Sequence, residues 1–366
     1  MIRQLVNNIY YVGVNDRQKD LFENMLPLQY GVSYNSYLIN DEKTVLVDTV
    51  EHPFVEQLIN QVTSVLNGKP LDYLIVNHME PDHSSGIKTL KLLYPDLQII
   101  LNAKTADMLN GYYGISDNLY IVKDGDTFST GSKTLSFHFT PMVHWPEVMM
   151  TYVKEDELLF SADAFGCFAN IVGKYGLPVQ NALKKLSGTP IKMICSLHGP
   201  VWKDEIAKVV GIYDTLSKYE AEPGVVIVYG SMYGHTEQMA EAVAEGAASI
   251  TKNVKVYDVS RTNASYILAD IFRYKGFICG SPTYCNELYP EINSLLAKIK
   301  TRGIKNREFG CFGSFTWAGA TLKNFKAFAE EMKWDCVATP EIKQNMTEEQ
   351  YKELYNLGRV IAEKTI

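Results

Sequence analysis

Hydrophobic and polar positions follow one pattern up to about residue 222 and a different one beyond it. In the first part, short apolar runs typical of strands dominate, and polar turn clusters such as residues 123–126 separate some of them. These runs cover residues 44–48, 71–76, 98–101, 134–139 and 158–160. Helical periodicity is found at residues 53–66, 84–94, 177–186 and 204–219. Many short strands with few helices predict stacked sheets that are flanked by helices.

A Pro-Gly pair at residues 223–224 ends the last of these helical patterns, so we expect one domain at residues 1–222 and a second at 223–366. In the second domain, strands and helices alternate regularly. Strands are expected at residues 225–229, 254–258, 276–280, 308–313 and near 335–337, and helices begin at or near Thr236, Ala264, Pro290, Ala320 and Thr347. This alternation predicts a doubly wound parallel sheet with its ligand site at the carboxyl ends of the strands.

Side chains that can bind a metal follow four strand-like runs of the first domain. They are His78, Glu80, Asp82, His83, His144, Asp163 and His198. A single histidine or aspartate at a strand end is usually a hydrogen-bonded turn residue. Seven such residues on four strand ends of one domain predict a metal site. We expect Pro81 to stiffen the loop that carries the first four, and we interpret His52 and His138 as structural.

The ligand types indicate which metal binds. A zinc hydrolase would be expected to carry a third nitrogen ligand where Glu80 stands, because zinc favours imidazole and thiolate. Four imidazoles with three carboxylates form a harder, more anionic set, which suits iron or manganese. The carboxylates offset much of the charge of two divalent ions, and one of them can bridge the pair. We therefore favour iron.

Three loops of the second domain follow its expected strands and are rich in small residues. The first, residues 230–237, leads into a helix whose N-terminus attracts an anion. It lacks the dinucleotide and Walker patterns, so a terminal monophosphate such as that of FMN fits better. The other loops add Tyr284 and Trp317, which can stack on a flavin ring. Alone, Thr236 is also a suitable N-cap, and the two aromatic residues are also suitable covers for the sheet end.

The three loops together predict bound flavin. The candidate cofactor-binding residues are Ser231, Met232, Tyr233, Gly234, His235, Thr236, Pro282, Thr283, Tyr284, Cys285, Asn286, Ser314, Phe315, Thr316, Trp317, Ala318 and Gly319.

Charge and composition exclude several classes of partner. The 366-residue chain has a net charge of -7 and no basic run longer than two residues, which disfavours nucleic acid and anionic membrane. No apolar stretch approaches the ~18 residues that a membrane span needs, and the N-terminus does not resemble an export signal, so we expect a cytoplasmic protein. The six cysteines form no C-x-x-C pair, which excludes a rubredoxin-like centre. Most lie in apolar runs and are interpreted as buried thiols.

The order H-x-E-x-D-H, followed by a distant His, an Asp and a His, resembles the metal domain of flavodiiron proteins, as do residues 144–147 and 161–166. The flavin loops are similar to those of flavodoxin, and the domain order matches this family along essentially the whole chain. The resemblance implies an N-terminal metallo-β-lactamase-like αββα sandwich followed by a flavodoxin-like doubly wound parallel sheet. The first is an α+β domain and the second is an α/β domain.

The resemblance also implies specific roles. One iron would be held by His78, Glu80 and His144, the other by Asp82, His83 and His198, and Asp163 would bridge them. In some family members the residue matching His83 does not bind iron. Phosphate contacts are implied for Ser231, Tyr233, Gly234, His235 and Thr236, and ring contacts for the loops around Thr283–Tyr284 and Phe315–Trp317.

The implied activity is reduction of O2 to water, NO to N2O, or both, by a diiron centre that receives electrons through FMN. The metal ligands are then the catalytic residues. The chain ends at Ile366 without a fused rubredoxin or reductase, so we expect an external donor, either a rubredoxin or reduced coenzyme F420. A head-to-tail homodimer or a dimer of dimers is implied.

The segment between Asp163 and His198 is shorter than the resemblance leads us to expect, and residues 166–182 lack an expected helical insert, which leaves the choice between O2 and NO open. Two other function classes are compatible with the residues alone. One is a metal-dependent hydrolase with an appended flavodoxin module. The other is an FMN electron carrier with an inactive metal site.

Overall fold

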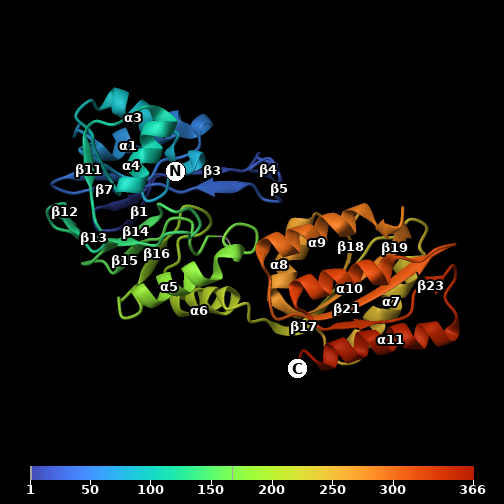
Figure 1. Cartoon of the computed structure of the whole chain (residues 1–366). Helices are drawn as coiled ribbons and strands as arrows, with labels where there is room; N and C mark the ends of the chain where they lie inside the picture. Colours follow the sequence, from blue (N-terminus) through green and yellow to red (C-terminus); the bar gives the residue numbers. More distant parts are fainter. Residues whose placement is uncertain (1, 167) are drawn as a thin grey trace. The chain divides into compact units, whose positions relative to one another are not determined.

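The computed structural model describes residues 2–166 and 168–366, and it divides into two compact units, residues 1–214 and 215–366 (Figure 1). Cys167 lies outside the described residues. The division falls within helix α6 (Ile206–Ser217), whereas the boundary that we place at residues 222–223 stays a prediction. In the part of the chain that the structure describes, no helix is long and apolar enough to span a membrane.

The first unit is built on two β-sheets. The seven-stranded sheet contains, in spatial order, β1 (Arg3–Val6), β2 (Ile9–Tyr11), β7 (Tyr37–Asn40), β8 (Thr44–Val47), β9 (Tyr73–Ile75), β10 (Gln98–Leu101) and β11 (Leu119–Ile121). The five-stranded sheet contains β12 (Thr127–Ser129), β13 (Thr134–Phe139), β14 (Met149–Val153), β15 (Leu158–Phe160) and β16 (Met193–Cys195). Two short ribbons pair β3 (Val14–Asp16) with β6 (Val32–Tyr34) and β4 (Leu21–Phe22) with β5 (Leu26–Pro27).

The two sheets of the first unit pack face to face. Val47 and Ile75 of one sheet and Phe137 and Phe160 of the other belong to a single buried apolar cluster. Burying each such side chain contributes about 1.5–3 kcal/mol. The helices of this unit are η1 (His52–Phe54), α1 (Val55–Leu66), α2 (Pro81–Ser84), α3 (Ile87–Leu93), α4 (Ala103–Tyr113), η2 (Gly173–Tyr175), α5 (Gly176–Leu186) and α6.

Helices cover both outer faces of this sandwich (Figure 1). Buried leucines of α1, α3 and α4 pack on the seven-stranded sheet, and α5 and α6 lie beyond the five-stranded one. The result is the αββα sandwich that the sequence predicts. The helix expected from Ser84 to Tyr94 is found as α3, and the separate short helix α2 precedes it. Pro81 begins α2 instead of stiffening a loop, since its fixed φ suits the first helical position.

The second unit contains one parallel sheet with the strand order β18-β17-β19-β21-β22. The strands are β17 (Glu222–Tyr229), β18 (Val254–Asp258), β19 (Tyr274–Tyr284), β21 (Glu308–Phe315) and β22 (Cys336–Ala338), with the short β20 (Glu287–Leu288) beside β19 and β23 (Ile342–Lys343) beside β21. The helices are α7 (His235–Ala248), α8 (Ala264–Arg273), α9 (Pro290–Arg302), α10 (Thr321–Met332) and α11 (Glu348–Glu363). This strand order is that of a flavodoxin-like doubly wound sheet.

Glycines allow α7 and α11 to pack closely over one face of this sheet. A Cβ atom at Gly246 would lie 1.8 Å from the carbonyl oxygen of Tyr355, and one at Gly358 would lie 1.9 Å from that of Val243. Neither backbone could remain where it is with a larger residue. The two glycines therefore fix α7, whose N-terminus faces the predicted flavin loops.

Arg307 holds the segment that precedes β17 against the second unit. Its side chain is 4% exposed, and its guanidinium donates hydrogen bonds to the carbonyl oxygens of Tyr219, Ile271 and Phe272 at 2.9, 2.7 and 2.8 Å. Two of these carbonyls belong to the C-terminal end of α8, where the helix dipole favours a cation. Burial nevertheless lowers the pKa of Arg307 to about 10.

Candidate functional site

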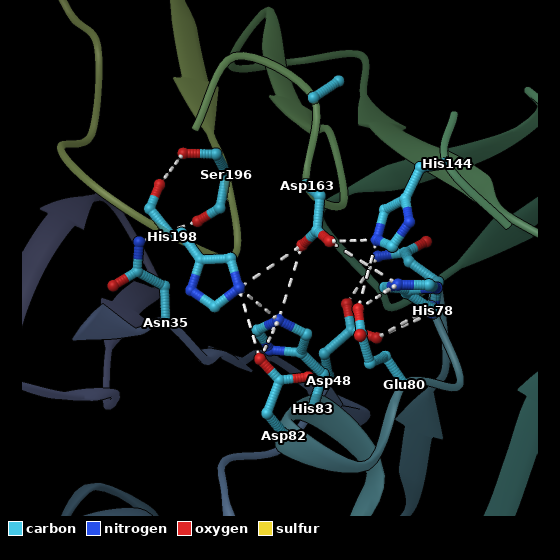
Figure 2. Close-up of polar contacts among 12 residues, drawn as sticks. Asn35, Asp48, His78, Glu80, Asp82, His83, His144, Asp163, Ser196 and His198 are labelled. Carbon is cyan, nitrogen blue, oxygen red and sulfur yellow. Dashed lines mark hydrogen bonds and ion pairs between the residues drawn. The ribbon is translucent and has the colours of Figure 1, made fainter. Parts of the chain in front are cut away.

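The seven candidate metal ligands come together at one end of the first unit, from the segments that follow β9, β13, β15 and β16, with Asp82 and His83 in the short helix α2 (Figure 2). They form two groups, one of His78, Glu80, His144 and Asp163 and the other of Asp82, His83 and His198, and the ligand atoms within each group lie within 4.8 Å of one another. His78 and His83 are 0% exposed and Asp163 is 1% exposed. Strand pairing places the ends of β13, β15 and β16 at one edge of the five-stranded sheet, and β9 reaches them from the sheet packed against it.

In the first group, two imidazoles face two carboxylates. The Nε2 atoms of His78 and His144 lie 3.2 and 3.1 Å from Oε2 of Glu80. The same two nitrogen atoms lie 3.5 and 3.0 Å from Oδ2 of Asp163. Ligands placed ~2.1 Å from one ion are roughly 3.0–3.4 Å apart in octahedral or tetrahedral geometry. The spacing in this group is therefore that of ligands around one cation.

The second group repeats this arrangement. Oδ2 of Asp82 lies 3.3 Å from Nε2 of both His83 and His198, and these two Nε2 atoms are 3.0 Å apart.

Asp163 faces both groups, as Figure 2 shows. Its Oδ2 points at His78 and His144, while its Oδ1 lies 3.4 Å from Nε2 of His83 and 3.8 Å from that of His198. A carboxylate with one oxygen directed at each group is placed to bridge two ions.

Hydrogen bonds to residues outside the ligand set determine which ring nitrogen carries the proton in His78 and His198. Nδ1 of His78 donates to Oε1 of the buried Glu147 at 2.8 Å, and Nδ1 of His198 donates to the carbonyl oxygen of Ser33 at 2.8 Å. Their Nε2 lone pairs then face carboxylate oxygens and other imidazoles. Hydrogen-bond acceptors that face one another in a buried site require cations between them. Histidines that bind a metal through one ring nitrogen usually donate a hydrogen bond from the other, as His78 and His198 do here.

Protons satisfy part of this requirement when no metal is bound. Burial opposes protonation of His144 and His198, but the facing carboxylates of Asp163 and Asp82 respectively outweigh it and raise each pKa to about 9. Burial opposes ionisation of Asp163, yet the surrounding imidazoles hold its pKa well below the usual range. Both oxygens of Asp82 and Oδ1 of Asp163 are buried without a hydrogen-bond partner. Orphaned carboxylate oxygens beside imidazole lone pairs fit a pair of metal ions.

Residues outside the candidate set support its backbone and cover it. Asp48, 1% exposed, accepts hydrogen bonds from the backbone N–H groups of Asn77 and His78 at 2.8 and 3.3 Å. Burial raises the pKa of Asp48 to about 6. The rings of Phe22 and Tyr34 pack edge-on against His198 with centroids 5.2 and 5.9 Å away. These residues were not predicted, because they come from segments without a chemical motif.

The three predicted flavin loops surround a cavity of about 720 Å³ in the second unit. Fifteen of the candidate residues line it, namely Ser231, Met232, Tyr233, His235, Thr236, Pro282, Thr283, Tyr284, Cys285, Asn286, Ser314, Phe315, Thr316, Trp317 and Ala318. Gly234 and Gly319 lie in the same loops but are not among the lining residues. Gln344, which was not predicted, also lines the cavity from the loop after β23.

The local structure of these loops suits a phosphate and a flat ring. Helix α7 begins after Gly234, which has a φ of 90° and no side-chain cap, so the first N–H groups of the helix are free for an anion. Thr236 lies inside the helix and is not its N-cap. Trp317 and Tyr284, the two candidate covers of the sheet end, are 88% and 44% exposed, so neither is buried against it.

Comparisons with known proteins agree with this architecture. The family model for ODP family beta lactamase matches residues 32–186, and that for flavodoxin matches residues 227–356. The anaerobic nitric oxide reductase flavorubredoxin of Salmonella paratyphi B is 34% identical over 347 residues, which is 86% of this chain and 72% of that protein. The flavodiiron protein of Giardia intestinalis has a TM-score of 0.94 at 27% identity, over 100% of this chain and 97% of that one. The chain belongs to the flavodiiron family.

A second solved structure, the rubredoxin oxygen:oxidoreductase of Desulfovibrio gigas, matches this flavodiiron protein with a TM-score of 0.94 and 28% identity, covering 100% of this chain and 98% of that one. The flavodoxin domain indicates FMN as a cofactor, and the two His/Asp/Glu groups fit a diiron site. The flavodiiron protein is therefore an oxidoreductase.

Proposed function

We propose that this flavodiiron protein takes electrons from an external donor through FMN and uses its diiron centre to reduce O2 to water, NO to N2O, or both. The observation that carries the proposal is the pair of ligand groups joined by Asp163, on a chain that also contains the flavin cavity. A hydrolase would not need the flavin cavity, and an electron carrier would not need seven buried ligands.

The proposed ligand sets follow the two groups. His78, Glu80 and His144 would hold one iron, Asp82, His83 and His198 would hold the other, and Asp163 faces both groups. Two adjacent irons held there would supply a reducing, polarising centre for a diatomic molecule, and a bound flavin would supply electrons one at a time. The chain orients the ligands through Glu147 and Ser33. The rings of Phe22 and Tyr34, which pack on His198, limit the access of water to the site.

The proposed flavin-binding residues are the candidates that line the cavity, together with Gly234 and Gly319. The N-terminus of α7 and the hydroxyl groups of Ser231 and Thr236 hold the phosphate. No lysine or arginine lines the cavity among the described residues, so helix and hydroxyl dipoles, with His235, receive the phosphate charge.

A rubredoxin is the donor that we propose first, because the names of two relatives include rubredoxin. Reduced coenzyme F420 is the alternative. We further propose that two copies pair head to tail, singly or as a dimer of dimers, so that the flavin of one copy serves the irons of the other. Two-fold pairing is the commonest oligomer symmetry. Mixing a flavin-deficient variant with an iron-deficient variant tests this, because shared sites restore turnover and independent chains do not.

The function itself is tested by measuring O2 and NO consumption side by side with a reduced rubredoxin and with reduced F420. We expect the wild type to consume at least one gas, and we expect Glu80→Ala and Asp163→Ala to lose this activity and iron together. Glu56→Gln, at an exposed carboxylate of α1, is the matched control and should keep both. Full gas consumption by the two alanine variants, or zinc without iron in the wild type, would contradict the proposal.

A further inference from the structure

Two cysteines outside both cofactor sites lie against each other in the second unit. Sγ of Cys311 in β21 is 3.5 Å from Sγ of Cys336 in β22. The two strands pair in parallel, with Cys311 opposite Ala338 and Cys336 opposite Phe309. On the other side of Cys311, Cys279 in β19 is its direct neighbour in register. The Cys311–Cys336 pair, named the dithiol below, is therefore in van der Waals contact without being bonded.

The two thiols of the dithiol have different surroundings. Cys311 is 0% exposed, whereas Cys336 is half-buried at the start of the edge strand β22. Cys311 therefore keeps its proton and donates it in a hydrogen bond to Cys336. This hydrogen bond lowers the pKa of the Cys336 thiol, and the charge of Lys326 lowers it further against the effect of burial. An accessible thiol with a lowered pKa beside a second thiol is the usual arrangement of a reactive cysteine and its resolving partner.

We propose that Cys311 and Cys336 form a modification site that hydrogen peroxide converts to a disulfide. This goes beyond the proposed function and does not depend on it. The Cys336 thiolate attacks the O–O bond, which breaks to give a sulfenic acid at Cys336 and, after protonation of the leaving hydroxide, one water. The Cys311 sulfur then attacks the Cys336 sulfur, the S–O bond breaks, and the thiol proton leaves with the hydroxide as a second water. Two thiols are oxidised by two electrons and one peroxide is reduced.

The position of the dithiol allows the small movement that bond formation needs. β22 is three residues long, lies at the sheet edge, and is half-buried throughout, so it can shift toward β21 at little cost. β21 continues from Cys311 to Ser314 and Phe315, which line the flavin cavity. Because the disulfide ties the edge strand to the strand that carries these two residues, we expect oxidation to change the FMN dissociation constant several-fold.

The test uses the FMN-loaded full-length protein and graded additions of hydrogen peroxide, followed by thiol counting after unfolding and peptide mapping by mass spectrometry. We expect a loss of two of the six thiols together, one crosslinked peptide joining Cys311 to Cys336, and full reversal by dithiothreitol. Cys195→Ala, which removes a cysteine of the first unit, is the matched control and should give the same crosslink.

Two variants separate the roles of the thiols. Cys311→Ser should stop at a sulfenic acid on Cys336 that dimedone traps, and Cys311→Ala repeats the test if the serine variant does not fold. Cys336→Ser should leave Cys311 unlabelled, because Cys311 is buried. Preferential oxidation of Cys285, loss of one thiol without the other, or a crosslink between chains on a non-reducing gel would overturn the site. An FMN dissociation constant that is equal in the two forms would overturn the coupling to the cavity.

Discussion

Replacing Glu147 with glutamine tests how the protein prepares His78 for metal binding. Oε1 of Glu147 accepts hydrogen bonds from Nδ1 of His78 at 2.8 Å and from the backbone N–H of Met79 at 3.0 Å, and the residue is 1% exposed. Glutamine has the same shape and can keep both bonds, but it lacks the charge that strengthens them. Its amide nitrogen also replaces Oε2, which is buried without a partner, so an unsatisfied donor is added.

The expected loss of iron affinity depends on the hydrogen bond between Glu147 and His78. Mutating such a partner of a metal-binding histidine weakens metal binding by about 10- to 100-fold, which corresponds to roughly 1.4–2.8 kcal/mol. The assay is anaerobic competition for Fe(II) with a chromophoric chelator, with iron content measured after dialysis. Glu56→Gln removes an exposed carboxylate of the same unit and should bind iron as the wild type does. Iron affinity of Glu147→Gln within about twofold of the wild type would refute the role given to Glu147.

Four further outcomes are expected. Iron uptake by the metal-free protein should release protons, and the affinity for iron should rise as the pH increases from 6.5 to 9. The reason is that His144 and His198, with pKa values of about 9, must lose their protons before they can bind iron. An iron affinity that does not depend on pH would contradict this. Because these pKa values are raised in the folded state, protonation of the two histidines stabilises the metal-free protein below pH 6.5, and this stabilisation is lost as the pH rises through 9. The melting temperature of the metal-free protein, measured by calorimetry, should therefore fall over that range. Trp317→Ala should weaken FMN binding by ~0.5–1.5 kcal/mol in fluorescence titration, and an unchanged affinity would exclude ring stacking. Arg307→Met should lower the free energy of unfolding in urea by about 2–4 kcal/mol, because several carbonyl oxygens lose their donor, and a smaller loss would mean that water replaces the guanidinium.

The sequence predicted the parts of the fold that have strong periodicity. The five strands and helices of the second unit lie where the alternation placed them, because apolar strand segments such as residues 225–229 regularly alternate with amphipathic helices. The first unit was harder. Its strands β1 to β6 have two to four residues each, too few for an apolar alternation to stand out. Helix α4 was missed, although Asn102 caps it by accepting from the backbone N–H groups of Lys104 and Thr105.

The candidate metal ligands could be found because histidines are scarce and these four follow apolar runs. The groups that accept hydrogen bonds from these ligands could not be predicted, and the physical reason differs from one group to the next. The acceptor for His198 is the backbone carbonyl of Ser33, which any residue could supply, so no side chain signals it. Glu147 stands within the family motif at residues 144–147, but only the fold shows that it faces His78. Gln344 reaches the flavin cavity through the two-residue strand β23, whose pairing with β21 depends on the complete sheet.

The central claim is that four separate segments of the first unit hold a pair of irons, with Asp163 between them. Metal and flavin content per chain, measured on protein purified without oxygen, tests it most directly. The account predicts about two iron ions and one FMN for each wild-type chain, and loss of both irons with retention of FMN in Asp163→Ala. Zinc in place of iron, a single metal ion per chain, or an Asp163→Ala protein that keeps both irons would contradict it.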